Sequence, residues 1–124
     1  MKNVLGTDLK SCSQNPKTGF FRDGFCRTNE KDQGKHVVAS IMTDEFLTFS
    51  KSKGNDLTTP NPIYGFPGLK KGNKWCLCAM RWQEAYAAGY APKVILEATH
   101  ERALDYIKLE NLIERSRNTK ETGS

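Results

Sequence analysis

The sequence predicts a small α/β domain with a mainly parallel sheet built from three strand-helix units. First, one pattern occurs three times: a short apolar run, a very short polar turn, and an amphipathic helix. Second, the apolar runs have no polar face, which favours an interior sheet covered by helices. Third, a strand, a helix and a strand follow one another across residues 74–98, as in a right-handed parallel crossover. With 124 residues, the chain is long enough for one domain and too short for two.

The first unit is a predicted strand at residues 36–42 and a helix at residues 43–54. Thr43 is a good N-cap, and Asp44 and Glu45 suit the positive end of the helix dipole. Gly54 is the expected left-handed stop. The apolar stripe that should face the core is Phe46, Leu47 and Phe49.

The second and third units repeat this arrangement. The second is a strand at residues 74–79 and a helix at 80–92, and Gly89 followed by Pro92 predicts where that helix ends. The third is a strand at 93–98 and a helix at 99–107, with Thr99 as its N-cap. The expected inward-facing residues are Trp82, Ala85 and Tyr86 in the second unit, and Ala103, Leu104 and Ile107 in the third.

The remaining segments are less regular. An irregular N-terminal segment includes Asp23-Gly24, which is typical of a type I′ hairpin turn within residues 20–26. Residues 55–73 form a long Pro/Gly-rich loop, and its apolar residues predict that it packs down as a cover. A final short helix is expected at 109–117. We expect a single domain over residues 1–115 and a disordered C-terminal tail over residues 116–124.

Composition and charge argue against several classes of protein. A hydrophobic fraction of 37% with 10% aromatic residues favours a packed globule over disorder. No apolar run approaches the length needed to span a bilayer, so we expect no membrane association. The net charge of +5 comes from scattered basic residues, which argues against a nucleic-acid partner. The N-terminus has no apolar signal core, so we expect a cytoplasmic location; the oligomeric state cannot be read from the sequence.

Two cysteines lie one residue apart in the second predicted strand. Free cysteines in an apolar strand behave as small hydrophobic residues, so we expect Cys76 and Cys78 to be largely buried, reduced and free of metal. We therefore expect no cofactor. The alternative is a structural zinc site, although the spacings do not form two CxxC pairs. Its ligands would be Cys12, Cys26, Cys76 and Cys78.

In a parallel sheet, the three strand-to-helix turns meet at the carboxyl ends of the strands, where open α/β sheets bind ligands. Three helix N-termini would offer free backbone N–H groups there, and the guanidinium of Arg81 suits a carboxylate or phosphate. We therefore expect a binding or interaction module for a small anionic ligand or a protein partner. The predicted ligand-binding residues are Thr43, Asp44, Glu45, Arg81, Thr99 and His100.

Each of these residues also has a simpler structural interpretation: Thr43 and Thr99 as caps, the acids as first-turn charges, Arg81 as the partner of an acid on a neighbouring helix, and His100 as a surface residue. The sequence leaves open whether the protein is an enzyme. The enzymatic alternative is a thiol-dependent reaction with Cys78 as nucleophile and His100 as base. Glu45 or Glu101 would orient the imidazole. Beside a helix start, His100 should favour its neutral form.

Four stretches of the chain carry a resemblance to a known family. They read NPKTGFFRDGFC, MTDEFLTFSKSKGNDL, YGFPGLKKGNKWCLCAMRWQEA and LEATHERAL. The chain resembles an uncharacterised family of small, mostly bacterial proteins, domain of unknown function 2237. The resemblance implies a stand-alone domain and supplies no catalytic residues. Members often have cysteines where this chain has Phe25 and Ala39, so a metal site that depends on those extra thiols is not expected here.

Overall fold

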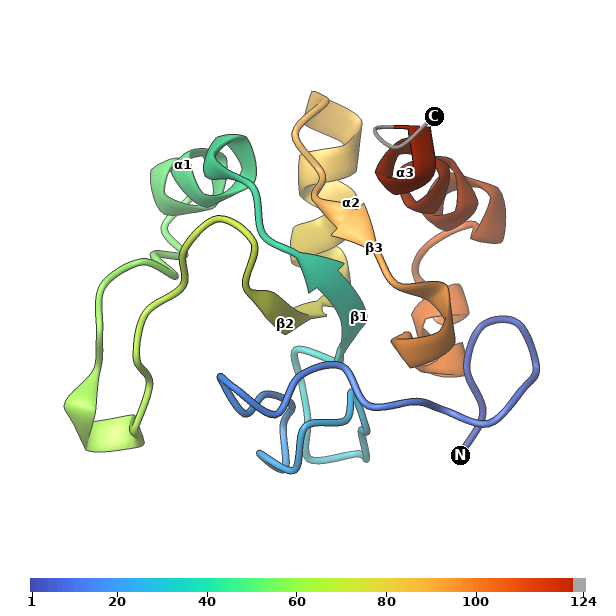
Figure 1. Ribbon diagram of the computed structural model, residues 1–124, viewed down its shortest axis with the longest axis horizontal. Coiled ribbons are helices and arrows are strands. Elements are labelled where there is room, and N and C mark those ends of the chain that lie inside the picture. Colours follow the sequence, from blue (N-terminus) through green and yellow to red (C-terminus); the bar gives the residue numbers. More distant parts are fainter. Residues whose placement is uncertain (122–124) are drawn as a thin grey trace.

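The computed structural model describes residues 1–121, with side chains described as far as residue 116. Within these residues the strands form one three-stranded sheet in the order β2-β1-β3 (Figure 1). The strands are β1 (His36–Ile41), β2 (Lys74–Cys78) and β3 (Lys93–Val94). Both outer strands pair with β1 in the antiparallel sense. The outer edge of β2 is therefore free of strand partners in the described part of the chain.

The prediction of a mainly parallel sheet is wrong. The link from β2 through a helix to β3 does join two strands of the same direction, as a crossover should, but β1 lies between them and runs the opposite way. Apolar residues on both faces of a strand show that the sheet is covered, and they carry no information on direction. The long loop before β2 gives the chain enough length to return beside β1 in either direction.

Three of the predicted helices are confirmed, and two of them have the predicted caps. Helix α1 (Asp44–Ser52) begins after Thr43, whose side-chain oxygen accepts a hydrogen bond from the Phe46 N–H at 3.1 Å. Helix α2 (Ala79–Ala88) ends at Gly89, which has the left-handed φ of 87° that the sequence predicts. The local signals for these helices are strong because capping and amphipathic spacing point to the same boundaries.

The prediction of a third strand-helix unit is largely wrong. Strand β3 has two residues, and the expected helix is replaced by the short 3₁₀ turns η2 (Leu96–Ala98) and η3 (Glu101–Asp105). Thr99 is not an N-cap: its buried hydroxyl donates to the Ile95 carbonyl at 2.9 Å and accepts the Ala39 N–H at 3.1 Å. This side chain thereby occupies a β1 amide that a longer β3 would have used. Leu104, which was expected to face inward, is 42% exposed.

The main core lies between the sheet and the helices, and a smaller cluster lies under the N-terminal segment. Trp82, Phe46 and Met42 are among the largest fully buried side chains of the main core. Helix α3 (Leu109–Glu121) packs against β3. The tail expected over residues 116–124 begins inside this helix, and residues 122–124 lie outside the described residues. The smaller cluster comprises Cys12, Cys26, Ala39, Cys76 and Ala98.

The N-terminal segment and the long loop shape the rest of the surface. Residues 1–35 contain no helix or ladder strand among the described elements, so the hairpin expected at 20–26 is absent. This segment lies along one side of the sheet, below the strands in the view of Figure 1. Loop 55–73 covers the core only in part: Leu69 is buried and Phe66 packs on Trp75, but Ile63, in the short turn η1 (Pro62–Tyr64), is 89% exposed.

Candidate functional site

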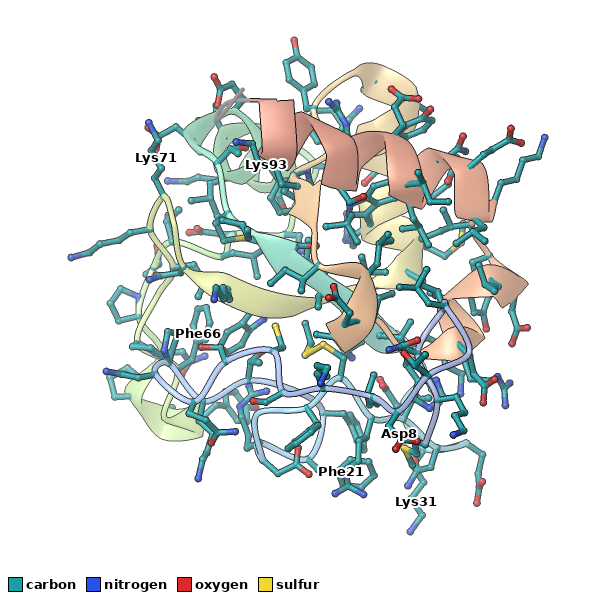
Figure 2. The ribbon with its side chains drawn as sticks, turned by 45° about the vertical axis from the view of Figure 1, so that its right-hand side comes forward. Asp8, Phe21, Lys31, Phe66, Lys71 and Lys93 are labelled. Carbon is teal, nitrogen blue, oxygen red and sulfur yellow. A yellow bond between two sulfur atoms is a disulfide. The ribbon has the colours of Figure 1, made fainter. Side chains whose placement is uncertain are left out.

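A cavity of about 710 Å³ borders the free edge of β2, and we call it the edge cavity. Residues of β2, of the N-terminal segment, of loop 55–73 and of the first turn of α2 all contribute to it. In Figure 2 the labelled Phe66 marks the side formed by the loop. The lining residues used below are Arg22, His36, Asp56, Phe66, Trp75, Cys78 and Arg81.

Two guanidinium groups line the edge cavity. The Arg22 Cζ lies 5.1 Å from the centroid of the Trp75 ring, and Arg22 Nη1 donates to the Gly19 carbonyl at 2.7 Å. Arg81 Nη1 donates to the Lys53 carbonyl at 3.2 Å and lies 3.5 Å from the Glu84 carboxylate. In both groups these contacts are made by Nη1 alone, which leaves most of the guanidinium donors available to a ligand. These two positive groups make the cavity suitable for an anion.

Asp56 is the carboxylate on the lining of this cavity. Its Oδ2 accepts the Thr59 hydroxyl at 2.6 Å, and its Oδ1 accepts the Thr58 hydroxyl at 2.8 Å and the Thr58 N–H at 2.9 Å. Hydrogen bonds from Thr59, which has the largest effect, and from Thr58 hold the pKa of Asp56 well below its usual value. Asp56 is therefore ionised and offsets one of the two guanidinium charges.

His36 is held by a buried carboxylate. Its Nδ1 lies 2.7 Å from Asp32 Oδ1, and the Asp32 side chain is 0% exposed whereas that of His36 is 42% exposed. Asp32 Oδ2 also accepts the His36 N–H at 2.9 Å and the Thr28 hydroxyl at 3.0 Å. Burial alone would raise the pKa of Asp32, but the bonds from His36 and Thr28 together lower it. An ionised Asp32 is an acceptor only, so in the neutral imidazole of His36 Nδ1 carries the proton and Nε2 is the acceptor.

Cys78 is the half-buried free thiol of this region. It is the last residue of β2 and the N-cap position of α2. His36 and Cys78 are paired directly across the two strands, and the register shifts immediately afterwards, between His36 and Val38. Residues directly opposite on antiparallel strands project from the same face. The thiol and the imidazole are therefore on the same face of the strand pair, and both residues line the edge cavity.

The other three cysteines are buried together beneath the N-terminal segment. Cys26 and Cys76 form a disulfide, so the prediction that Cys76 is reduced is wrong, although its burial is confirmed. The sulfur of Cys12 lies within 4.8 Å of both. Figure 2 shows the disulfide between the strands and the N-terminal segment. Burial raises the pKa of Cys12 to about 12, so this thiol stays protonated at neutral pH. Cys78, the fourth ligand of the zinc alternative, is not in this group.

The chain was compared with models of known protein families. A model described as "uncharacterized protein conserved in bacteria (DUF2237)" matches residues 2–116. The chain belongs to this family. None of the curated proteins in the comparison matches it. This DUF2237 chain is thus a small bacterial domain of unknown function, as its sequence motifs indicated, and none of its helices within residues 1–121 is long and apolar enough to cross a membrane.

The strand-end patch that the sequence predicted is not assembled in this DUF2237 protein. Ile41, at the end of β1, pairs with Lys74 and Lys93, the first residues of the neighbouring strands. Thr43, Asp44 and Glu45 therefore follow one end of the sheet. Arg81 and the segment from Thr99 to Glu101 follow the other end, because the sheet is antiparallel.

His100, a predicted ligand-binding residue and the base of the enzymatic alternative, is the N-cap of a short 3₁₀ turn. It is buried, its Nδ1 accepts the Arg102 N–H at 3.0 Å, and it caps η3. Burial lowers the pKa of His100, so the expected preference for the neutral form is confirmed, with burial rather than the helix dipole as the main cause. His100 does not line the edge cavity.

Of the edge cavity, the sequence predicted Cys78 and Arg81, whereas Arg22, His36 and the Asp32 carboxylate that holds His36 were not predicted. Cys78 and Arg81 were found because they flank the strand-to-helix turn of the second unit. His36 and Asp32 were missed, although a carboxylate four residues before a histidine in a turn is a detectable signal. Arg22 carried no local signal, because the contacts of residues 19–22 with β2 are made through the tertiary fold alone.

Proposed function

We propose that the edge cavity binds a small organic anion with an apolar or aromatic body. The observation that carries this proposal is the presence of Arg22 and Arg81, two guanidinium groups from distant parts of the chain, on the lining of one cavity. Of the binding residues predicted from sequence, Arg81 alone belongs to this proposal. A protein partner at the strand ends and a cytoplasmic location stay predictions.

The chemistry of the lining favours such a ligand over a simple inorganic ion. Guanidinium groups bind carboxylates through paired N–H donors and stack on flat rings. Trp75 and Phe66 pack edge to face at 5.3 Å and supply an apolar wall next to these charges. A volume of about 710 Å³ lies in the range of sites for small molecules. With Asp56 also ionised, the lining has a small positive excess, which suits a singly charged ligand.

Binding of benzoate, with benzamide as its neutral analogue, tests the proposal. Trp75 borders the cavity whereas Trp82 is fully buried and donates to the Pro92 carbonyl, so a change in tryptophan fluorescence reports on Trp75. We expect benzoate to bind measurably more tightly than benzamide at constant ionic strength. Arg81→Gln and Arg22→Asn should each weaken benzoate binding by about 10- to 100-fold, the effect of losing a hydrogen bond to a charged group. Asparagine is chosen at position 22 because Arg22 has a φ of 53°.

The matched control is Arg102→Gln. Arg102 is an exposed arginine paired with Asp105 at 2.7 Å, away from the edge cavity, so its loss should leave benzoate binding unchanged. Equal binding of benzoate and benzamide, or equal losses in all three variants, would show that the cavity does not select anions.

A further inference from the structure

We propose that Cys78, His36 and Asp32 form a thiol acyl-transfer site on the lining of the edge cavity. Cys78 is the nucleophile, His36 is the general base, and Asp32 is a positioning residue that orients the imidazole. The substrate class rests on the proposed function: a small ester or thioester whose carboxylate is held by Arg22 and Arg81. The thiol chemistry itself depends on the three residues alone.

The first support is the position of the thiol relative to the imidazole. Directly opposed residues of antiparallel strands have Cβ atoms about 4.5–5.5 Å apart, which is within reach of a cysteine and a histidine side chain. His36 and Cys78 are such a pair, and both line the edge cavity. A register shift of the β-bulge type follows the pair, and such bulges commonly change the direction of a side chain next to a functional site.

The second support is the fixed orientation of the imidazole. Asp32 is fully buried, and its two oxygens are occupied by the His36 ring, the His36 N–H and the Thr28 hydroxyl. The ring also packs over Gly34, where an added Cβ would lie 2.8 Å from His36 Cε1 and 3.3 Å from Nε2. The carboxylate fixes the tautomer that leaves Nε2 as the acceptor, which is the form that a general base requires.

The third support is the start of α2 directly after the thiol. The Ala79 N–H is already bonded to the Lys35 carbonyl at 3.0 Å. The N–H groups of Met80 and Arg81 belong to the first turn, before the helix's own hydrogen-bond ladder begins. Such groups stabilise negative charge, so they are the donors that this site offers to the oxygen of a tetrahedral intermediate.

The reaction balances with water as the only co-reactant. His36 Nε2 takes the thiol proton while Cys78 Sγ forms a bond to the carbonyl carbon, and the carbonyl π electrons move to oxygen. When the carbonyl re-forms, the bond to the leaving group breaks and the leaving group departs with the proton from Nε2. Water then attacks the thioester, His36 takes its proton, the C–S bond breaks, and Cys78 regains a proton. The products are a carboxylic acid and an alcohol or thiol.

Acylation of the intact protein by two chromogenic esters tests this site. The probes are p-nitrophenyl acetate, which is neutral, and the mono-p-nitrophenyl ester of glutaric acid, which carries a free carboxylate. We expect release of nitrophenolate and a mass increase confined to the peptide that contains Cys78. Cys12, the other free thiol, is buried and protonated and should not react. Cys78→Ser should abolish labelling.

The two histidines of the chain give a matched pair of variants. His36→Asn keeps an N–H donor for Asp32 and removes Nε2, so acylation by the neutral ester should fall about 100-fold, the usual contribution of a general base. His100→Asn keeps a capping side chain that does not line the cavity, and it should not change the rate. Gly34→Ala leaves every reacting group in place but displaces the imidazole, and it should lower the rate without lowering the melting temperature by more than a few degrees.

A separate NMR measurement tests the role of Asp32. In Asp32→Asn the ¹⁵N chemical shifts of the His36 ring should report loss of the Nδ1-protonated tautomer, together with a slower acylation. Equal rates for wild type, His36→Asn and Gly34→Ala would overturn the thiol site. The anion site is judged separately: Arg22→Asn and Arg81→Gln should slow the glutarate ester by a larger factor than the acetate ester. If these variants change the rates of both esters by the same factor, the proposed function fails while the thiol site stands.

Discussion

His36 and His100 show how strongly the setting of a single residue decides its chemistry. Both are histidines near the start of a secondary-structure element, and in sequence His100 has the more suggestive neighbours. The fold gives His36 a buried carboxylate and a cavity, whereas it gives His100 a capping hydrogen bond and a buried position. The first residue therefore has the surroundings that the proposed proton transfer needs, whereas the second caps a turn.

His100 should make the folded protein less stable in mild acid. Because burial lowers its pKa in the folded state, the unfolded chain binds more protons as the pH falls below about 6.5, the ordinary value for histidine. The free energy of unfolding should therefore be constant above that pH and decrease below it, until the folded state also titrates. Urea unfolding between pH 7.5 and about 5 measures this slope. In His100→Asn the slope in this window should be reduced; an unchanged slope would assign the proton uptake to another group.

The role of a single residue could be predicted from the sequence where that role is set by its neighbours in the chain. Thr43 was identified as a cap because the hydrogen bond to Phe46 spans three residues. Arg22 could not be identified, since its place beside Trp75 depends on how the N-terminal segment crosses the edge of β2. Thr99 was misassigned as a cap because its hydroxyl is bonded to Ala39, sixty positions earlier in the chain.

Among the elements, helix α2 ends where the sequence predicts, and Gly89 carries that boundary. Gly89→Ala should lower the free energy of unfolding by about 1 kcal/mol, the cost of a Cβ in the left-handed region. Nothing lies within 4 Å of the added Cβ, so the cost is conformational and not steric. Thermal or urea unfolding measures it. Gly89→Asn is the matched control, because asparagine tolerates this conformation, and it should cost clearly less. Equal effects of the two substitutions would argue against this explanation.

The helices of this protein could be predicted from sequence, and the direction of its strands could not. Helix signals are local, since caps and apolar spacing lie within a few turns of each other. Strand direction depends on pairing between residues such as Ile41 and Lys74, which are separated by a long loop. The wrong strand direction also affected the predicted site, because that site assumed that three strand ends meet at one edge.

For the molecule as a whole, the Cys26–Cys76 disulfide joins the N-terminal segment to the sheet across a sequence separation of 50. Reduction should lower the free energy of unfolding by about 2–4 kcal/mol, because the unfolded chain regains the freedom of a loop of this length. Urea unfolding with and without a phosphine reductant measures the difference. A Cys26→Ala/Cys76→Ala double variant should have lost this stabilisation and should not respond to the reductant. If the reductant destabilised the double variant as much as the wild type, the disulfide would not be the source of the stabilisation.

The hydrogen bonds that fix the N-terminal segment also determine when the protein can be completed during translation. The Asn3 side chain donates to the Glu97 carbonyl at 3.0 Å, across 94 positions, and the Val4 N–H donates to the Thr99 carbonyl at 3.0 Å. At about 5–20 residues per second, the ribosome adds Glu97 several seconds after Asn3. Until then Asn3 can bond only to its near neighbours Thr7 and Asp8, and its distant partner, the Glu97 carbonyl, does not exist. A nascent chain halted before Glu97 would lack both of these hydrogen bonds, and the smaller core cluster around Cys12 would lack Ala98.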